Sequence, residues 1–138
     1  MIIFKKTLAI LILLGLVFFS FQSCSKYSEG PLISLRSKTE RVSNTWKVDN
    51  YKVNGVDYTS LVTEYSETFT KEGNYSYEWQ IITGKGTWAF QNNNMEILIS
   101  GTENQSTVVL NILKLEEKQF WYYYMDGDDR KEFHMIQK

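Results

Sequence analysis

The sequence offers few side chains that could do acid–base or nucleophilic chemistry. His134 is the only histidine and Cys24 the only cysteine, and there is no Gly-x-Ser-x-Gly motif of the kind that carries the nucleophile of many hydrolases. His134 lies in a stretch of alternating polar and apolar residues, which favours a β-strand, so we expect it to pack against a neighbouring strand. The sequence therefore predicts no catalytic residue and no enzyme.

A group of carboxylates, Asp126-Gly127-Asp128-Asp129, has the oxygen ligands that hard cations such as Ca²⁺ prefer. It lacks the longer spacing and the terminal glutamate of an EF-hand loop, whereas Asp-Gly is ordinary hairpin chemistry. We interpret the segment as a turn, and we predict no metal site and no cofactor.

Aromatic residues alternate with polar ones in the middle of the chain. Tyr75, Tyr77 and Trp79 share one face of a period-two segment, and Trp88 and Phe90 share one face of the next. This alternation predicts strands that turn their rings inward. Tyrosine hydroxyls and tryptophan indoles in such an interior could orient a small ligand. The alternative is that the rings simply fill the core.

The last region predicts a hairpin with two different faces. If residues 126–129 form the turn, Met125 pairs with Arg130, and counting back assigns the remaining pairs. The apolar pairs, expected to point inward, are Tyr122–Phe133 and Phe120–Met135, and the outward pairs are Trp121–His134 and Tyr123–Glu132. Trp121 and Tyr123 are therefore a candidate contact patch for a partner.

The elements that must position these residues are short strands. Period-two patterning predicts about eight, near residues 45–53, 56–59, 65–70, 74–81, 85–91, 95–100, 106–115 and 119–136, the last folding back on itself. The breaks between them are Asn54-Gly55, residues 71–73, Thr83-Gly84, residues 92–94, 101–105 and 126–129. Such short connections favour an antiparallel up-and-down meander, and a meander of this size removes its exposed edges by closing into a barrel.

Two short helical segments are also expected. Ser37 and Glu40 have the spacing of a capping box, which predicts a helical turn to about Ser43, ended by Asn44 in a left-handed conformation. Residues 59–64 favour another short helix.

The first 24 residues have the layout of a secretory signal. Lys5 and Lys6 precede a nearly unbroken apolar run over residues 8–19, which is shorter than the roughly 20 residues that a membrane-spanning helix needs. The run is followed by Phe21-Gln22-Ser23-Cys24, which resembles a lipobox, the site at which a cysteine receives a diacylglycerol. We therefore expect Cys24 to be lipidated and to anchor the protein in a membrane.

Composition and charge set the domain organisation. The formal net charge is −1, but the two lysines of the first 23 residues leave 13 basic against 16 acidic side chains after cleavage, a net charge of −3. This balance, together with the lack of any basic run in the sequence, disfavours nucleic-acid binding, which needs clustered lysine and arginine side chains. We predict a signal peptide over residues 1–23, a lipidated cysteine and flexible tether over 24–36, and one β-barrel domain over 37–138.

The barrel segment resembles the lipocalin-like domains of small bacterial lipoproteins. The resemblance rests on a helical turn leading into Thr45-Trp46-Lys47-Val48, and on the segments at residues 69–75, 84–88 and 112–115. It implies that Trp46 plugs the closed end of the barrel and that the interior is a site for a small apolar molecule. The candidate ligand-binding residues are then Trp46, Phe69, Tyr75, Tyr77, Trp79, Trp88, Phe90 and Tyr122.

Two functions remain open at this point. The first is a lipid-anchored binding module of the bacterial envelope, with the outer membrane as the expected location because Ser25 follows the lipidated cysteine. It would hold a small hydrophobic or amphipathic molecule. The second is a structural or interaction protein with a filled barrel, which acts through Trp121 and Tyr123. The sequence does not predict an oligomeric state.

Overall fold

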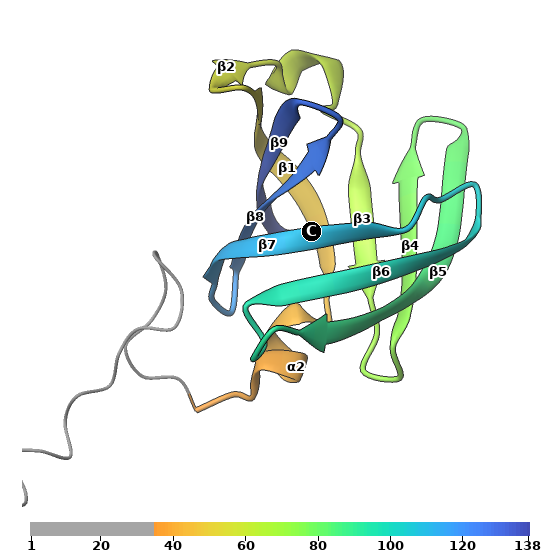
Figure 1. Ribbon diagram of the computed structural model, residues 1–138, viewed down its shortest axis with the longest axis vertical. Coiled ribbons are helices and arrows are strands. Elements are labelled where there is room, and N and C mark those ends of the chain that lie inside the picture. Colours follow the sequence, from red (N-terminus) through yellow and green to blue (C-terminus); the bar gives the residue numbers. More distant parts are fainter. Residues whose placement is uncertain (1–34) are drawn as a thin grey trace, which may run out of the picture.

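The computed structural model describes residues 35–138, whose strands wrap into an antiparallel β-barrel (Figure 1). A short helix, α2 (Lys38–Val42), precedes the strands. The strands are β1 (Thr45–Val53), β2 (Val56–Asp57), β3 (Ser66–Phe69), β4 (Asn74–Trp79), β5 (Ile82–Gln91), β6 (Glu96–Glu103), β7 (Val108–Leu115), β8 (Gln119–Asp126) and β9 (Asp129–Gln137). Pairing of β1 with β9 closes the sheet on itself, so the predicted all-β barrel is confirmed.

The small strand β2 lies outside the ring. It forms a hairpin with the end of β1, whereas β3 pairs with the beginning of β1 instead of with β2. A strictly sequential meander was therefore the wrong expectation at this one connection. β1 is nine residues long, so one edge of it has room to pair with β3 near its beginning and with β2 near its end. Residues 59–61 form a single 3-10 turn, shorter than the predicted helix.

Most predicted turns are confirmed by their backbone conformation. Asn54 and Gly55 both have positive φ, at 50° and 83°, as a two-residue hairpin turn with the twist of its strands requires. The three asparagines at 92–94 also have positive φ, a conformation that asparagine adopts more readily than most residues. The register of the last hairpin is as predicted at every pair, from Phe120–Met135 to Met125–Arg130.

The turn between β4 and β5 is displaced from its predicted position. Thr83 and Gly84 lie inside β5, and the chain reverses at Gln80 and Ile81, where Gln80 has a φ of 55°. Gly84 is needed for another reason: a Cβ there would lie 2.2 Å from Cε1 of Tyr77. This glycine allows the ring of Tyr77 to pack closely against the backbone of β5, and glycine commonly occurs in strands where another group approaches the backbone.

Helix α2 covers one end of the barrel, at the bottom of Figure 1. The predicted capping box is present: the amide of Glu40 donates to Ser37 Oγ at 3.2 Å, and the Glu40 carboxylate accepts from the Ser37 amide at 2.9 Å. The helix ends at Val42 with Ser43 as its C-cap, and Asn44 does not adopt the predicted left-handed conformation. Instead, its side-chain oxygen accepts a hydrogen bond from the amide of Thr45.

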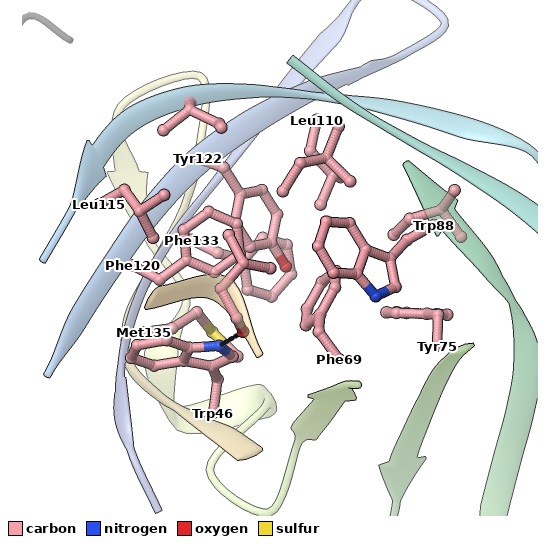
Figure 2. Close-up of a cluster of buried hydrophobic side chains, with 14 residues drawn as sticks. Trp46, Phe69, Tyr75, Trp88, Leu110, Leu115, Phe120, Tyr122, Phe133 and Met135 are labelled. Carbon is pink, nitrogen blue, oxygen red and sulfur yellow. Dashed lines mark hydrogen bonds between the residues drawn. The ribbon is translucent and has the colours of Figure 1, made fainter. Parts of the chain in front are cut away.

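Next to the helix, the interior of the barrel is filled with side chains (Figure 2). Trp46 is fully buried there, and its indole N–H donates to the carbonyl of Val42 at 2.9 Å, which fastens the helix to the first strand. Phe69 packs edge-on against Tyr75, Trp88 and Phe120, with ring centroids 5.1–5.8 Å apart. Such pairs add to the stabilisation that burial alone provides. This half of the barrel is closed and solid.

Candidate functional site

A buried carboxylate lies in the middle of the barrel. Tyr65, Glu67 and Phe69 alternate along β3 and the residue before it, so all three point to the interior. Glu67 is only 3% exposed. Oε1 of Glu67 accepts hydrogen bonds from the hydroxyls of Tyr65 at 2.7 Å and Tyr75 at 2.8 Å, and Oε2 accepts from Tyr122 at 2.9 Å. Tyrosines from β4, from β8 and from the residue before β3 thus donate to one carboxylate.

Burial dominates the electrostatics of this cluster. It raises the pKa of Glu67 above its ordinary value, because an ionised carboxylate loses hydration there, and the three hydroxyl donors oppose the rise. The pKa values of Tyr65, Tyr75 and Tyr122 are also raised, first by burial and then by the charge of Glu67. The hydroxyls therefore remain protonated donors at neutral pH. Among the described residues, no ion pair joins Glu67 to a cation.

Above this cluster, the barrel opens into a pocket of about 340 Å³. It lies at the end away from α2, and Glu67, Tyr75 and Tyr122 form its buried floor. Ile99, Val108 and Leu110 contribute an apolar wall. The other residues around it are Tyr65, Tyr77, Asn104, Gln105, Ser106, Thr107, Tyr124, Met125 and Asp126. The size is at the lower end of the range for small-molecule sites.

The rim of the pocket is held by specific contacts. The hydroxyl of Tyr77 donates to the carbonyl of Asn104 at 2.8 Å, and this ties β4 to the loop between β6 and β7. The rings of Tyr65 and Tyr77 stack with centroids 5.8 Å apart. At the opposite side of the mouth, Asp126 forms an ion pair with Lys131. The pocket is therefore shaped by side chains that already have partners.

The structure divides the predicted ligand-binding set. Tyr75, Tyr77 and Tyr122 line the pocket. Trp46, Phe69 and Trp88 belong to the packed core below it, and Phe90 packs against Trp88 from the edge of that core. Trp79 is half-buried at the end of β4 and belongs to neither group. The interior is thus a filled core in the half of the barrel next to α2 and is open as a pocket in the other half.

Sequence reasoning missed Glu67, Tyr65 and Tyr124. A signal for the first two was present, because alternation from Phe69 assigns Glu67 and Tyr65 to the inward face. An acidic residue flanked by aromatic ones on one face of a short strand indicates a buried polar site. Tyr124 could have been found in the same way, by counting two residues on from Tyr122 in β8.

The outward aromatics lie where the hairpin register predicted, and cations cover them. Trp121 stacks on His134 with centroids 4.0 Å apart and has Nζ of Lys114 4.1 Å from its ring. The guanidinium of Arg130 lies 4.1 Å from the ring of Tyr123. His134 is thus in the cross-strand packing position expected of it, 2.8 Å from Glu132 Oε1.

Two of the predictions concern residues that precede the part of the chain described by the structure. Cys24 and the signal peptide lie outside the described residues. Within residues 35–138, no helix has the length and apolar character that crossing a membrane requires. The same part of the chain has no group of three or more histidine, cysteine or acidic side chains suited to a metal ion, and residues 126–129 form the predicted turn.

Comparison with known proteins supports the fold. No protein-family model matches the sequence. No curated protein matches it either. Among solved structures, the chain is similar to a DUF4847 family protein from Bacteroides vulgatus ATCC 8482, with a TM-score of 0.51 and 14% sequence identity over 71% of this chain and 94% of that one. At this level of identity the similarity extends to the small β-barrel and not to function.

Proposed function

We propose that this chain is a non-enzymatic, lipid-anchored binding protein of the bacterial envelope, whose lipocalin-like barrel holds a small hydrophobic or amphipathic molecule. The observation that carries the proposal is the pocket at the open end, with polar groups on its floor and an apolar wall beside them. Sites for small molecules commonly combine an apolar lining with a few fixed polar groups. The resemblance to lipocalin-like lipoprotein domains supports the same reading.

The alternative, an interaction protein that works through Trp121 and Tyr123, has less support. Lys114 and Arg130 cover these rings, so the outer face offers no bare aromatic patch. The pocket, in contrast, is open at one end of the barrel and has both polar and apolar groups in its lining.

The proposal is tested by filling the pocket. Val108 lines it, and the next residue, Val109, points to the other face of β7. In a protein comprising residues 25–138, Val108→Phe should weaken the binding of an uncharged hydrophobic dye by about tenfold, or ~1.4 kcal/mol. Native mass spectrometry of the unmodified protein should show co-purified or exchangeable ligand.

Two controls accompany this test. Val109→Phe adds the same ring outside the pocket and should leave dye affinity unchanged, as should a Trp121→Ser, Tyr123→Ser double variant. If the unmodified protein binds no dye and carries no ligand, the pocket does not function as a binding site. If the double variant is the one that loses the dye, the outer patch is the site.

A further inference from the structure

The side chains around the pocket have an uneven balance of charge. Two carboxylates, Glu67 and Asp126, line it, and none of its lining residues is lysine, arginine or histidine. Asp126 at the rim is paired with Lys131. Glu67 on the floor has only the three tyrosine hydroxyls as partners among the described contacts. The deepest part of the pocket therefore holds an acidic side chain, and among the described residues no cationic side chain is paired with it.

The hydrogen bonds to Glu67 leave room for another partner. A carboxylate has about four lone-pair positions, and the three hydroxyls occupy three of them. Hydroxyl donors spread the charge without neutralising it, and a buried charge without a counter-ion is costly. An arriving cation would lower that cost, whereas an anion would raise it by like-charge repulsion.

The rings around Glu67 favour the same kind of ligand. Five tyrosines line the pocket: Tyr65, Tyr75, Tyr77, Tyr122 and Tyr124. Tyr65 stacks on Tyr77, and Tyr122 and Tyr124 each stack on Phe133, so one face of each of these rings is covered. A tyrosine face that is turned to the pocket would attract an ammonium group, and the attraction grows when the site excludes water. A buried carboxylate among tyrosines thus combines two independent sources of attraction for one organic cation.

From this lining we infer that the pocket takes an organic ammonium compound, with its charged nitrogen beside Glu67 and the tyrosine rings and its apolar part against Ile99, Val108 and Leu110. The inference rests on the proposed binding function and names its ligand class. A fatty acid, whose carboxylate would meet Glu67, and a purely apolar molecule are the classes it disfavours.

A matched set of ligands tests the charge preference on the full-length protein in an uncharged maltoside detergent. Choline and 3,3-dimethyl-1-butanol have nearly the same shape and differ in one positive charge, and 3,3-dimethylbutanoate supplies the negative counterpart. NMR titration should show choline binding at least about tenfold more tightly than the neutral alcohol. The carboxylate should bind more weakly than the alcohol. This comparison needs no substitution, so it is independent of the stability of any variant.

Variants then assign the preference to Glu67. Glu67→Gln keeps the size of the side chain and removes its charge, so the advantage of choline over the alcohol should fall to within about threefold. Glu103→Gln removes a charge from an exposed position on β6, paired with Lys85 and not lining the pocket, and should leave the advantage intact. The choline affinity of the unmodified protein should also rise with pH as Glu67 ionises.

The outcomes separate the two proposals. Equal binding of choline and the alcohol, or tighter binding of the carboxylate, would overturn the ammonium preference while leaving the binding function in place. A full preference retained in Glu67→Gln would overturn the role of Glu67. Absence of binding by all three compounds, together with a negative dye experiment, would refute the pocket as a site of any kind.

Discussion

At the scale of single residues, Glu67 is the least expected feature of this barrel. A core position would be more stable with an apolar side chain of similar size, since satisfying a buried carboxylate with hydrogen bonds rarely offsets its lost hydration in full. Three tyrosines nevertheless direct their hydroxyls to it. Such an arrangement is common where a polar group serves recognition.

The raised pKa of Glu67 predicts a particular dependence of stability on pH. Because the folded-state pKa lies above the ordinary value of 4.5, folding favours the protonated form. The corresponding stability is fully present below about pH 4.5 and is lost as the pH rises through the folded-state pKa. In urea unfolding, the free energy of unfolding of the unmodified protein, measured relative to that of Glu67→Gln, should therefore be larger at pH 4.5 than at pH 8.

Both proteins are compared at each pH, so the contributions of the other carboxylates to the free energy of unfolding cancel. Among these carboxylates, Glu40, Asp57 and Glu72 have lowered pKa values, and their contribution to stability is lost as the pH falls. The tyrosines that face Glu67 have raised pKa values and do not titrate in this range. A difference that stays constant with pH, or grows towards pH 8, would contradict the assignment.

At the scale of elements, the two ends of the barrel are built differently. At one end α2 covers the core, held by the Trp46–Val42 hydrogen bond and by Nη1 of Arg41, which donates to the carbonyl of Leu115 at 2.8 Å. At the other end, the β6–β7 loop and the last residues of β8 contribute to the lining of the pocket. The covered end is therefore filled with large apolar side chains, among them Trp46 and Phe120.

The capping box of α2 should therefore contribute to the stability of the whole domain. Ser37→Ala removes the acceptor for the Glu40 amide at the start of a five-residue helix. Loss of an N-cap typically costs about 1 kcal/mol, so the midpoint of urea unfolding should fall by a corresponding amount while dye binding at the far end is retained.

The matched control is Thr39→Ala, at an exposed position inside the same helix. Alanine is a better helix former than threonine, so this change should leave stability equal or slightly increased. Equal stability of the Ser37→Ala variant and the unmodified protein would mean that the helix is held by its packing alone.

At the scale of the whole molecule, the chain enters the barrel at the covered end. Residue 35 precedes α2, so a tether at Cys24 would attach to the end opposite the pocket. The proposed anchor would then hold the protein at a membrane while the mouth of the barrel remains separate from the point of attachment. Ligand exchange and anchoring would involve different parts of the chain.

The proposed anchor is tested by replacing its only cysteine. Cys24→Ala in the full-length gene product should move the protein out of the membrane fraction and abolish incorporation of labelled palmitate, because no other residue can form the thioether. Ser28→Ala, in the same segment, should behave like the unmodified protein. Membrane association that survives Cys24→Ala would show that something other than a lipid holds the protein there.

The sequence by itself determined the strands, most turns and the inward faces. Alternation of aromatic and polar residues needs only the two-residue period of a strand, and the register of the β8–β9 hairpin follows from its turn. These are local properties, encoded within about ten neighbouring residues. The predicted position of the β4–β5 turn was wrong because Gly84 lies inside a strand, where its small size admits the ring of Tyr77, its partner across the hairpin.

Only the tertiary structure decided what the interior does. The inward aromatic residues follow the same alternating pattern in the sequence, yet Tyr75 and Tyr122 donate hydrogen bonds to Glu67 while Phe69 and Trp88 pack in the core nearer to α2. Whether an inward ring fills the core or lines a pocket depends on its height in the barrel. That height is set by the stagger of strands far apart in the chain and by the end that α2 covers, and neither is visible in a local pattern.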